Sequence, residues 1–314
     1  MLQLDRCPAC NSTSTAFDYE GVCRRTDDGG RPWSVTVCQD CGLRFLNPQP
    51  EWSDLSPYYD KSYSAYAPDH GTGGVEAEIA RAKAAGEYRH VRITPGMKVL
   101  DVGCGGGSFL QVVRGLGGIP QGVEPSEAGF RSTSAAGLPV FHGQLHEFIA
   151  SGQAERYDLI TASHVVEHHP EPVRMIQEMY SLLAPGGRLW FAVPNGETPD
   201  ALALRDRWHS TDLPFHLTHF GPRSMAKALE RAGIADYQLE TYSLPDAVEA
   251  SIQARLRWGI GLPVRISRHL PLGGIARKRG GRLDRENRGE SILVNAIAPA
   301  EAGATPQFHG IAAE

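Results

Sequence analysis

The sequence has no long hydrophobic run and few cysteines. None of its apolar stretches approaches the length of a membrane span, and Met1 is not followed by the basic and then apolar residues of a signal peptide. The 314 residues include only six cysteines, too few for a disulfide scaffold in a chain of this size. Basic residues are not in excess either, since the net charge is −5. We therefore expect a globular cytoplasmic protein with one large α/β domain and a small module.

Four of the six cysteines form two Cys-x-x-Cys pairs, Cys7 with Cys10 and Cys38 with Cys41. Four thiolates can close a tetrahedral shell around zinc and leave no open position for a substrate, as in structural zinc sites. Apolar and polar residues alternate between the two pairs, which predicts strands. We expect residues 1–50 to form a zinc ribbon. A redox dithiol is the alternative, and it requires a low-pKa thiol beside a helix.

The stretch Val99–Leu110 predicts a buried strand, a glycine turn and the first turn of a helix. It contains Asp-x-Gly-x-Gly-x-Gly, and such glycines let a ligand approach bare main chain at the positive end of a helix. Asp101 would repel a pyrophosphate but can hold an ammonium group. Glu124 ends the next apolar stretch, where nucleotide sites bind a ribose diol. The two acids together match S-adenosylmethionine, and the glycines predicted to lie beside it are Gly103, Gly105 and Gly107.

With these motifs, the chain resembles the class I S-adenosylmethionine-dependent methyltransferases over roughly residues 80–245. The resemblance implies that residues at the exit of the third strand contact adenine, which assigns that role to Gln144 and Leu145. Ser163 and His164 end the fourth predicted strand. Because ligands of doubly wound sheets lie beyond the carboxyl ends of the strands, we expect these two residues to contact the cofactor as well.

Strands alternate with helices along this part of the chain, which is typical of an α/β fold. We predict a Rossmann-like, doubly wound sheet of seven strands in which the last strand is antiparallel, with a helix over 75–92 before the first strand. The predicted core comprises 75–245 and 291–298. The tail from 299 to 314 is rich in Ala and Gly, and we expect it to be disordered.

Tyrosines are dense in the linker 51–74. A zinc module followed by such a segment and a methyltransferase core resembles the zinc-containing sugar methyltransferases of natural-product pathways. That resemblance implies a lid over the cofactor and a tyrosine in the active site, here Tyr63 or Tyr66. Alternatively, the rings only pack the linker onto the core.

A first cluster of candidate catalytic residues follows the fourth strand. His164, Glu167 and His168 have helical i, i+3, i+4 spacing and would share one face of a turn. The stretch resembles the Ser-Glu-x-x-Glu-His of ubiquinone-pathway O-methyltransferases, which implies a divalent metal at the active site. His164 replaces the first Glu of that pattern and argues against a hard cation, which prefers oxygen ligands. Alternatively, Glu167 and His168 are structural partners in a common methyltransferase turn.

A second cluster comprises His209, His216 and His219, and we prefer His216 as the general base because histidine titrates near neutral pH. The zinc-containing sugar C-methyltransferases have a Glu-His pair near this point, where this chain has Phe215-His216. The missing Glu favours a hydroxyl acceptor over a carbon acceptor.

The segment 246–290 is a basic insertion that we interpret as a substrate cap. From residue 251 to 290, ten basic residues face three acids, a local balance of +7. The basic residues are Arg255, Arg257, Arg265, Arg268, Arg277, Lys278, Arg279, Arg282, Arg285 and Arg288. Such asymmetry favours an anionic or nucleotide-linked small-molecule substrate or a peripheral membrane contact. A solvated basic surface without a partner is the alternative.

These patterns together predict a methyltransferase that uses S-adenosylmethionine and a histidine base to methylate a hydroxyl of a sugar, glycan or natural product. Three alternatives remain: a zinc-ribbon rRNA or tRNA methyltransferase, a sugar C-methyltransferase, and an S-adenosylmethionine-binding adaptor without activity. The low basic content of residues 1–50 argues against nucleic acid as the substrate. The sequence leaves the oligomeric state open.

Overall fold

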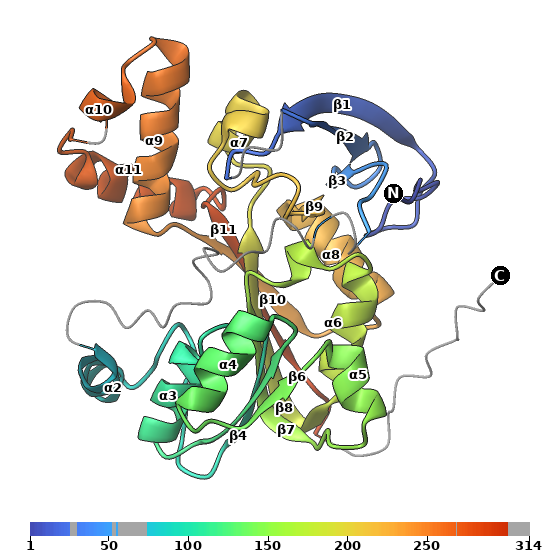
Figure 1. Ribbon diagram of the computed structural model, residues 1–314, viewed down its shortest axis with the longest axis vertical. Helices are drawn as coiled ribbons and strands as arrows, with labels where there is room; N and C mark the ends of the chain where they lie inside the picture. The colour runs from blue at the N-terminus through green and yellow to red at the C-terminus, as the bar shows by residue number, and fades with distance from the viewer. Residues whose placement is uncertain (26–29, 52–54, 56–73, 268, 301–314) are drawn as a thin grey trace.

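The computed structural model describes residues 1–25, 30–51, 55, 74–267 and 269–300. Its main sheet has seven strands in the order β10-β11-β8-β7-β4-β5-β6 (Figure 1). β11 is antiparallel to both β8 and β10, whereas the pairs among β8, β7, β4, β5 and β6 are parallel. The predicted Rossmann-like sheet with an antiparallel last strand is therefore confirmed. The strands are β4 (Lys98–Val102), β5 (Ile119–Glu124), β6 (Val140–His142), β7 (Tyr157–Ser163), β8 (Leu183–Pro194), β10 (Tyr237–Tyr242) and β11 (Ser291–Ile297).

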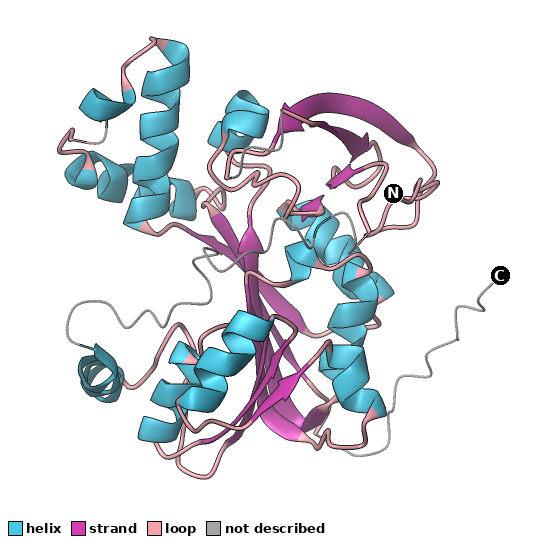
Figure 2. Ribbon diagram, in the orientation of Figure 1, coloured by secondary structure: helices cyan, strands magenta, loops and turns pink. Residues whose placement is uncertain are grey.

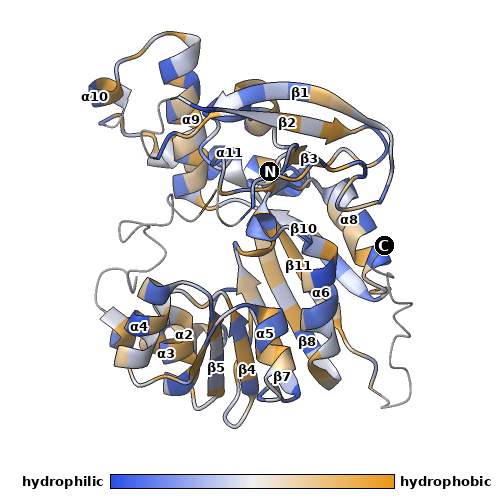
Figure 3. Ribbon diagram, turned by 45° about the vertical axis from the view of Figure 1, so that its right-hand side comes forward, coloured by the Kyte–Doolittle hydropathy of each residue, from blue (hydrophilic) through white to orange (hydrophobic). Residues whose placement is uncertain are grey.

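Helices cover both faces of this sheet, with the strands between them (Figure 2). Side chains alternate between the faces, so Val99 packs into the core on one face and Leu100 into the core on the other. Most positions of the central strands β4 and β7 are buried, as a sheet covered on both faces requires, although Figure 3 also shows hydrophilic positions in these strands. The helices beside the sheet are α2 (Gly74–Ala85), α3 (Ser108–Gly115), α4 (Glu127–Ala135), α5 (Leu145–Ala150), α6 (Pro172–Ser181) and α8 (Pro222–Arg231).

α2 is shorter than the predicted helix over 75–92. It ends at Ala85, because Tyr88 and Val91 pair through their backbones and turn the chain toward β4. The linker tyrosines Tyr63 and Tyr66, together with residues 301–314 of the predicted tail, lie outside the described residues.

The N-terminal segment forms a second, four-stranded sheet in the order β1-β2-β3-β9. Its first three strands belong to the predicted ribbon, but β9 comes from the core and pairs with β3. β9 has only two residues, too few to show the alternation of apolar and polar residues that indicates a strand, so the sequence did not predict it. The strands are β1 (Thr15–Val22), β2 (Pro32–Cys38), β3 (Arg44–Leu46) and β9 (Thr218–His219).

The insertion between β10 and β11 folds into α9 (Pro245–Gly259), α10 (Val264–Ser267) and α11 (Gly273–Arg285). Asp200, on α7 (Pro199–Leu204), is fully buried and forms ion pairs with Arg255 and Arg279 of the insertion. These pairs hold the base of the insertion on the core, because an unpaired buried carboxylate would be costly. Among the described residues, none of the helices has the length and apolar character needed to cross a membrane.

Candidate functional site

A cavity of about 1080 Å³ lies at the carboxyl ends of β4, β5 and β7. This is the edge of the sheet at which α/β proteins bind ligands. It exceeds the usual 300–1,000 Å³ of small-molecule pockets, so a cofactor and an acceptor both fit. Eight of the predicted cofactor residues line the cavity: Asp101, Gly103, Gly105, Glu124, Gln144, Leu145, Ser163 and His164.

Asp101 supplies a buried carboxylate at the end of β4. Its Oδ1 accepts a hydrogen bond from Thr161 Oγ1 at 2.7 Å. Burial raises the pKa of Asp101 to about 7, and the nearby negative charge of Glu124 also raises it. A cationic group in the cavity would favour the ionised form of this carboxylate.

Glu124 connects the end of β5 to the glycine turn. Its Oε2 accepts a hydrogen bond from Gly105 N at 2.8 Å, and its Oε1 accepts one from Ser126 N at 2.9 Å. Each carboxylate oxygen has a second lone pair, so the side chain can also accept hydrogen bonds from a ligand. Glu124 therefore fixes the shape of the turn and lines the cavity.

Two glycines of the turn have different surroundings. Gly103 has a φ of +70°, and a Cβ there would lie 2.6 Å from Val165 Cγ2. Gly107 precedes α3 and does not line the cavity. A Cβ at Gly107 would lie 2.9 Å from Thr133 Oγ1. Gly107 thus serves the packing of the turn, and its predicted contact with the cofactor remains a prediction.

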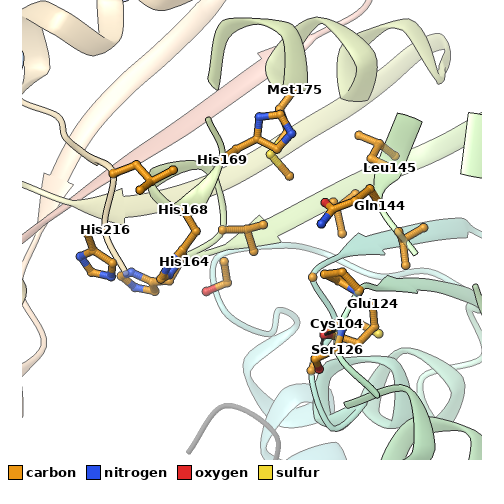
Figure 4. Close-up of a pocket in the computed structure, with 18 of the residues that line it drawn as sticks. Cys104, Glu124, Ser126, Gln144, Leu145, His164, His168, His169, Met175 and His216 are labelled. Atoms are coloured by element: carbon orange, nitrogen blue, oxygen red, sulfur yellow. Dashed lines mark hydrogen bonds between the residues drawn. The ribbon is translucent and has the colours of Figure 1, made fainter. Parts of the chain in front are cut away.

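Three histidines, His164, His168 and His216, lie across the cavity from Glu124 and Gln144 (Figure 4). They surround Glu167, whose side chain is only 1% exposed. The Glu167 Oε1 atom lies 3.3 Å from His164 Nδ1 and 4.0 Å from His216 Nε2, and its Oε2 has no hydrogen-bond partner. The single helical turn Val166–His168 places Glu167 and His168 side by side.

Backbone carbonyls fix the tautomers of the two deeper histidines. His168 Nδ1 donates to Phe215 O at 2.9 Å, and His216 Nδ1 donates to Ser210 O at 2.8 Å. Each ring therefore directs the lone pair of its Nε2 inward. One ligand atom from each of Glu167, His168 and His216 lies within 4.8 Å of the others, so the three can hold a metal ion.

The pKa values of the histidines shift in opposite directions. Burial, together with the neighbouring His168 and His219, holds the pKa of His216 well below its usual value. Burial also lowers the pKa of His164, but the hydrogen bond and charge of Glu167 outweigh it, so the pKa is raised. His164 is also the more accessible of the two, with a side chain that is 43% exposed. Neutral His216 suits a ligand role, and His164 is the stronger base.

The other two histidines of the second predicted cluster have different positions. His209 lines the cavity, and burial lowers its pKa to about 4. His219 belongs to β9, where its Nε2 donates to Thr211 O at 2.8 Å, and it is not part of the lining. Neither environment favours a proton acceptor at neutral pH.

The N-terminal ribbon supplies part of the cavity wall, which sequence reasoning missed. Arg25 pairs with Asp212 at 2.6 Å, and Asp212 Oδ2 lies 3.9 Å from His216 Nε2. No local motif marks Arg25, because its partner is nearly two hundred residues away in the chain. Further lining residues from this region are Leu2, Gln49, Pro50, Glu51 and Leu55. Among the described residues, none from 246 to 290 lines the cavity, so a capping role for the insertion stays a prediction.

The four predicted zinc ligands lie together at one end of the ribbon. Cys7 Sγ is 3.6 Å from Cys41 Sγ, and Cys10 Sγ is 3.5 Å from Cys38 Sγ. These separations are close to the edge of a tetrahedron with zinc–sulfur bonds of about 2.3 Å. Arg231 of α8 donates to the carbonyls of Pro8 and Ala9, which ties the cluster to the core.

The chain is similar to several known proteins. A ubiquinone biosynthesis O-methyltransferase of Actinobacillus pleuropneumoniae is 31% identical over 140 residues, which cover 42% of this chain and 57% of that protein. The Xanthomonas axonopodis protein of the same name is 34% identical over 170 residues, 50% of this chain and 70% of that one. The chain thus spans about half to two thirds of these relatives. A solved S-adenosylmethionine-dependent methyltransferase from Archaeoglobus fulgidus covers 72% of this chain and 95% of its own at 20% identity, with a TM-score of 0.45.

The methyltransferase domain family matches residues 76–239, which hold both acids, the glycine turn and Glu167. This match spans more than half of the chain, and it ends within β10. The chain therefore belongs to the methyltransferase domain family.

Proposed function

We propose that the protein transfers a methyl group from S-adenosylmethionine to a hydroxyl of a small molecule. The observation that carries this proposal is the lining of the cavity. The buried carboxylates of Asp101 and Glu124 line it together with His164, whose ring is paired with a third buried carboxylate, that of Glu167. The names of the ubiquinone O-methyltransferases also favour an oxygen acceptor in a small molecule. A sugar, glycan or other natural-product hydroxyl and a phenol are the acceptor classes to be distinguished.

In this proposal the cofactor occupies the half of the cavity formed by β4, β5 and β6. Asp101 would bind the ammonium group of the methionine part, and Glu124 the ribose diol. Gln144 and Leu145 follow β6 and would contact the adenine. Because Gly103 has no side chain, the cofactor can lie against the backbone of the turn.

His164 is our candidate for the general base. Glu167 orients its Nδ1, so the Nε2 lone pair is free to accept the proton of the acceptor hydroxyl. As the acceptor oxygen forms its bond to the methyl carbon, the carbon–sulfur bond breaks and S-adenosylhomocysteine leaves as a neutral thioether. Alignment of oxygen, carbon and sulfur supplies much of the rate, up to roughly 7 to 11 kcal/mol in intramolecular analogues.

A divalent ion is a second candidate for activating the acceptor. Glu167, His168 and His216 fit such an ion, because both histidines present Nε2 lone pairs and the buried Glu167 Oε2 has no partner. Backbone carbonyls orient the two rings, as they do for histidine ligands of metals. A bound ion would lower the pKa of the acceptor hydroxyl. Two nitrogen ligands favour a transition metal over magnesium.

We also propose that Cys7, Cys10, Cys38 and Cys41 bind one structural zinc ion. The closeness of their sulfur atoms and their burial support this assignment. The small β1-β2-β3 sheet has little core of its own, so the metal would supply much of its folding free energy.

The test is product formation from methyl-labelled S-adenosylmethionine with a panel of phenols, catechols, sugars and nucleotide-linked sugars. We expect at least one acceptor to give a labelled methyl ether. The rate of ether formation should be much lower in His164→Ala than in the wild type. Chelator treatment that leaves one zinc per chain in the ribbon, as metal analysis checks, separates the two activation modes. Activity that survives it supports His164 alone, whereas loss that added divalent ions restore supports the metal at Glu167. Label that appears only on carbon, on nitrogen or on RNA would contradict the proposal.

A further inference from the structure

Exposed hydrophobic side chains are concentrated at the outer end of the insertion. The described residues expose twelve large hydrophobic side chains, and five of them lie between residues 258 and 275. We call this segment, without Arg268, the apolar tip. Exposed hydrophobic residues are normally scattered singly, so such a concentration indicates an interaction surface. The five, each 46 to 73% exposed, are Trp258, Ile260, Val264, Ile266 and Ile275.

The tip projects away from the rest of the molecule. It contains the end of α9, α10 and the start of α11, which lie at the outer edge of the molecule in two views (Figures 1 and 3). The base of the insertion, in contrast, is fixed by the pairs of Asp200 with Arg255 and Arg279. A flat partner could therefore reach the tip without displacing the core.

Within the chain segment that forms the tip, the charged residues have one sign. No aspartate or glutamate occurs between residues 250 and 283, whereas this stretch contains eight arginines and lysines. A basic segment with exposed tryptophan and branched aliphatic side chains is typical of proteins that insert shallowly into the headgroup layer of an anionic membrane.

A headgroup-sized cavity lies beside the tip. Its volume is about 380 Å³. Its charged lining residues are Arg205, Arg207 and Arg255, together with Asp206, which pairs with Arg24, and Trp258 lies beside them. The guanidinium carbon of Arg207 lies 4.6 Å from the centre of the Trp258 ring, and Arg24 approaches the same ring at 5.2 Å. Tryptophan beside arginine is well suited to the membrane interface, where the ring meets acyl chains and the cation meets phosphate.

We propose that the apolar tip docks the protein on a membrane that contains anionic lipids. The basic residues of this acid-free segment attract the lipid phosphates, and the exposed aliphatic side chains enter the headgroup layer. Nucleic acid fits less well, because bases stack on aromatic rings and the tip has one aromatic side chain among five. A protein partner is also less favoured, because four of the five side chains are aliphatic and only one is a tryptophan, whereas tryptophan, tyrosine and arginine dominate protein interfaces.

The test is flotation of the full chain with vesicles of phosphatidylcholine and phosphatidylglycerol, beside vesicles of phosphatidylcholine alone. We expect the protein to float with the mixed vesicles, to float much less with phosphatidylcholine, and to detach as salt is raised. The double variant Ile260→Ser/Ile266→Ser should lose at least about tenfold in partitioning. Its matched control is Ile119→Ser/Ile297→Ser, which removes two isoleucines from the core sheet that are also about half exposed or more and should bind normally.

Charge and insertion are tested separately. Arg265→Glu should weaken flotation roughly tenfold, and Arg131→Glu, at a 75% exposed position on α4, should not. Vesicles should shift the tryptophan emission of the wild type to the blue, and Trp258→Phe should abolish the shift. All variants should keep the affinity of the wild type for S-adenosylmethionine, because the tip does not line the main cavity.

Three results would overturn the proposal. The first is a wild type that does not float with either vesicle, and the second is flotation that the tip variants leave unchanged. The third is binding to polyglutamate that is as tight as binding to the mixed vesicles and that Ile260→Ser/Ile266→Ser does not weaken. Such a result would mean that the tip binds anions in general. A dimer in gel filtration that these variants dissociate, without vesicle binding, would assign the tip to a second copy.

Discussion

The two halves of the main cavity are built in different ways. The half that we assign to the cofactor comes from one continuous region, residues 101–145. Its lining residues lie at or just after the ends of β4, β5 and β6. The half that we assign to the acceptor combines the turn after β7, the loop 205–217 and the N-terminal ribbon. The first half consists largely of backbone and carboxylates, and the second of histidines and arginines.

This difference suggests how the molecule separates its tasks. A cofactor of fixed chemistry can be held by a local turn whose shape Glu124 maintains. The acceptor half depends on contacts between distant segments, such as the pairing of β3 with β9 and of Arg25 with Asp212. We therefore expect changes in the ribbon to alter catalysis while leaving cofactor binding intact.

The largest expected effect is loss of the zinc cluster. Cys38→Ser should release the metal and unfold the ribbon, because structural zinc contributes about 10 to 16 kcal/mol in small peptides. Methyl transfer should then be lost, while calorimetry should still detect S-adenosylmethionine binding within about threefold of the wild type. Cys23→Ser, which changes a cysteine outside the cluster, is the control and should keep one zinc per chain. Equal loss of both functions would remove the distinction between the two halves.

Glu167→Gln should reduce kcat by about 10² to 10⁴, the range for a positioned base, since it would neutralise the partner of His164. The dissociation constant of S-adenosylmethionine should not change. Glu171→Gln, four residues along at the rim, should stay near wild-type activity because that side chain is 61% exposed. Steady-state kinetics check both variants, and a fully active Glu167→Gln would move the base elsewhere.

Gly103→Ala tests the backbone of the cofactor half. The positive φ and the 2.6 Å approach to Val165 Cγ2 mean that a methyl group must strain or displace the turn. We expect about tenfold weaker S-adenosylmethionine binding, given roughly 1 to 2 kcal/mol of strain. The double variant Gly103→Ala/Val165→Ala should recover part of the loss, and an unchanged affinity in the single variant would argue against a tight turn.

Cofactor affinity should depend on pH through Asp101. The pKa of about 7 in the ligand-free protein means that Asp101 must lose its proton to bind an ammonium group below that pH. Affinity should therefore fall by up to about tenfold per unit as the pH drops below 7, and level off above it. Calorimetry across pH 5.5 to 8.5 checks this, with Asp101→Asn as a variant that should show no such slope.

The smallest expected effect is that of Arg25→Gln. Partly exposed ion pairs contribute about 0.2 to 1 kcal/mol, so kcat/KM should fall by only about two- to fivefold. Only the kcat/KM for the acceptor should fall in Arg25→Gln, and the affinity for S-adenosylmethionine should not change. A change in cofactor affinity of the same size would show that the ribbon supports both halves.

Much of the fold could be predicted from the sequence, because each strand and helix of the core has its own apolar period. The gathering of Asp101, Glu124 and the glycines at one edge of the sheet could be predicted for the same reason, because these residues lie at the ends of predicted strands. The gathering of the four cysteines could be predicted from their spacing alone. In each case the decisive residues are close together in the chain.

The acceptor half could be predicted only in part. His164, Glu167 and His216 were expected to act, but their mutual positions depend on the fold: Ser210 and Phe215 fix two rings through main-chain carbonyls that no side-chain motif reveals. Our proposal of His164 in place of the predicted His216 rests on pKa directions that depend on burial and neighbouring histidines, which are properties of the folded chain. Arg25 and β9 left no local pattern.

The measurement that tests the central claim most directly is calorimetric titration of the purified protein with S-adenosylmethionine. We predict one site per chain, weakened by about ten- to a hundredfold in Asp101→Asn, because the ammonium group would lose its charged partner. Absence of binding to the wild type, or equal affinity in the variant, would contradict the assignment of the cavity to this cofactor.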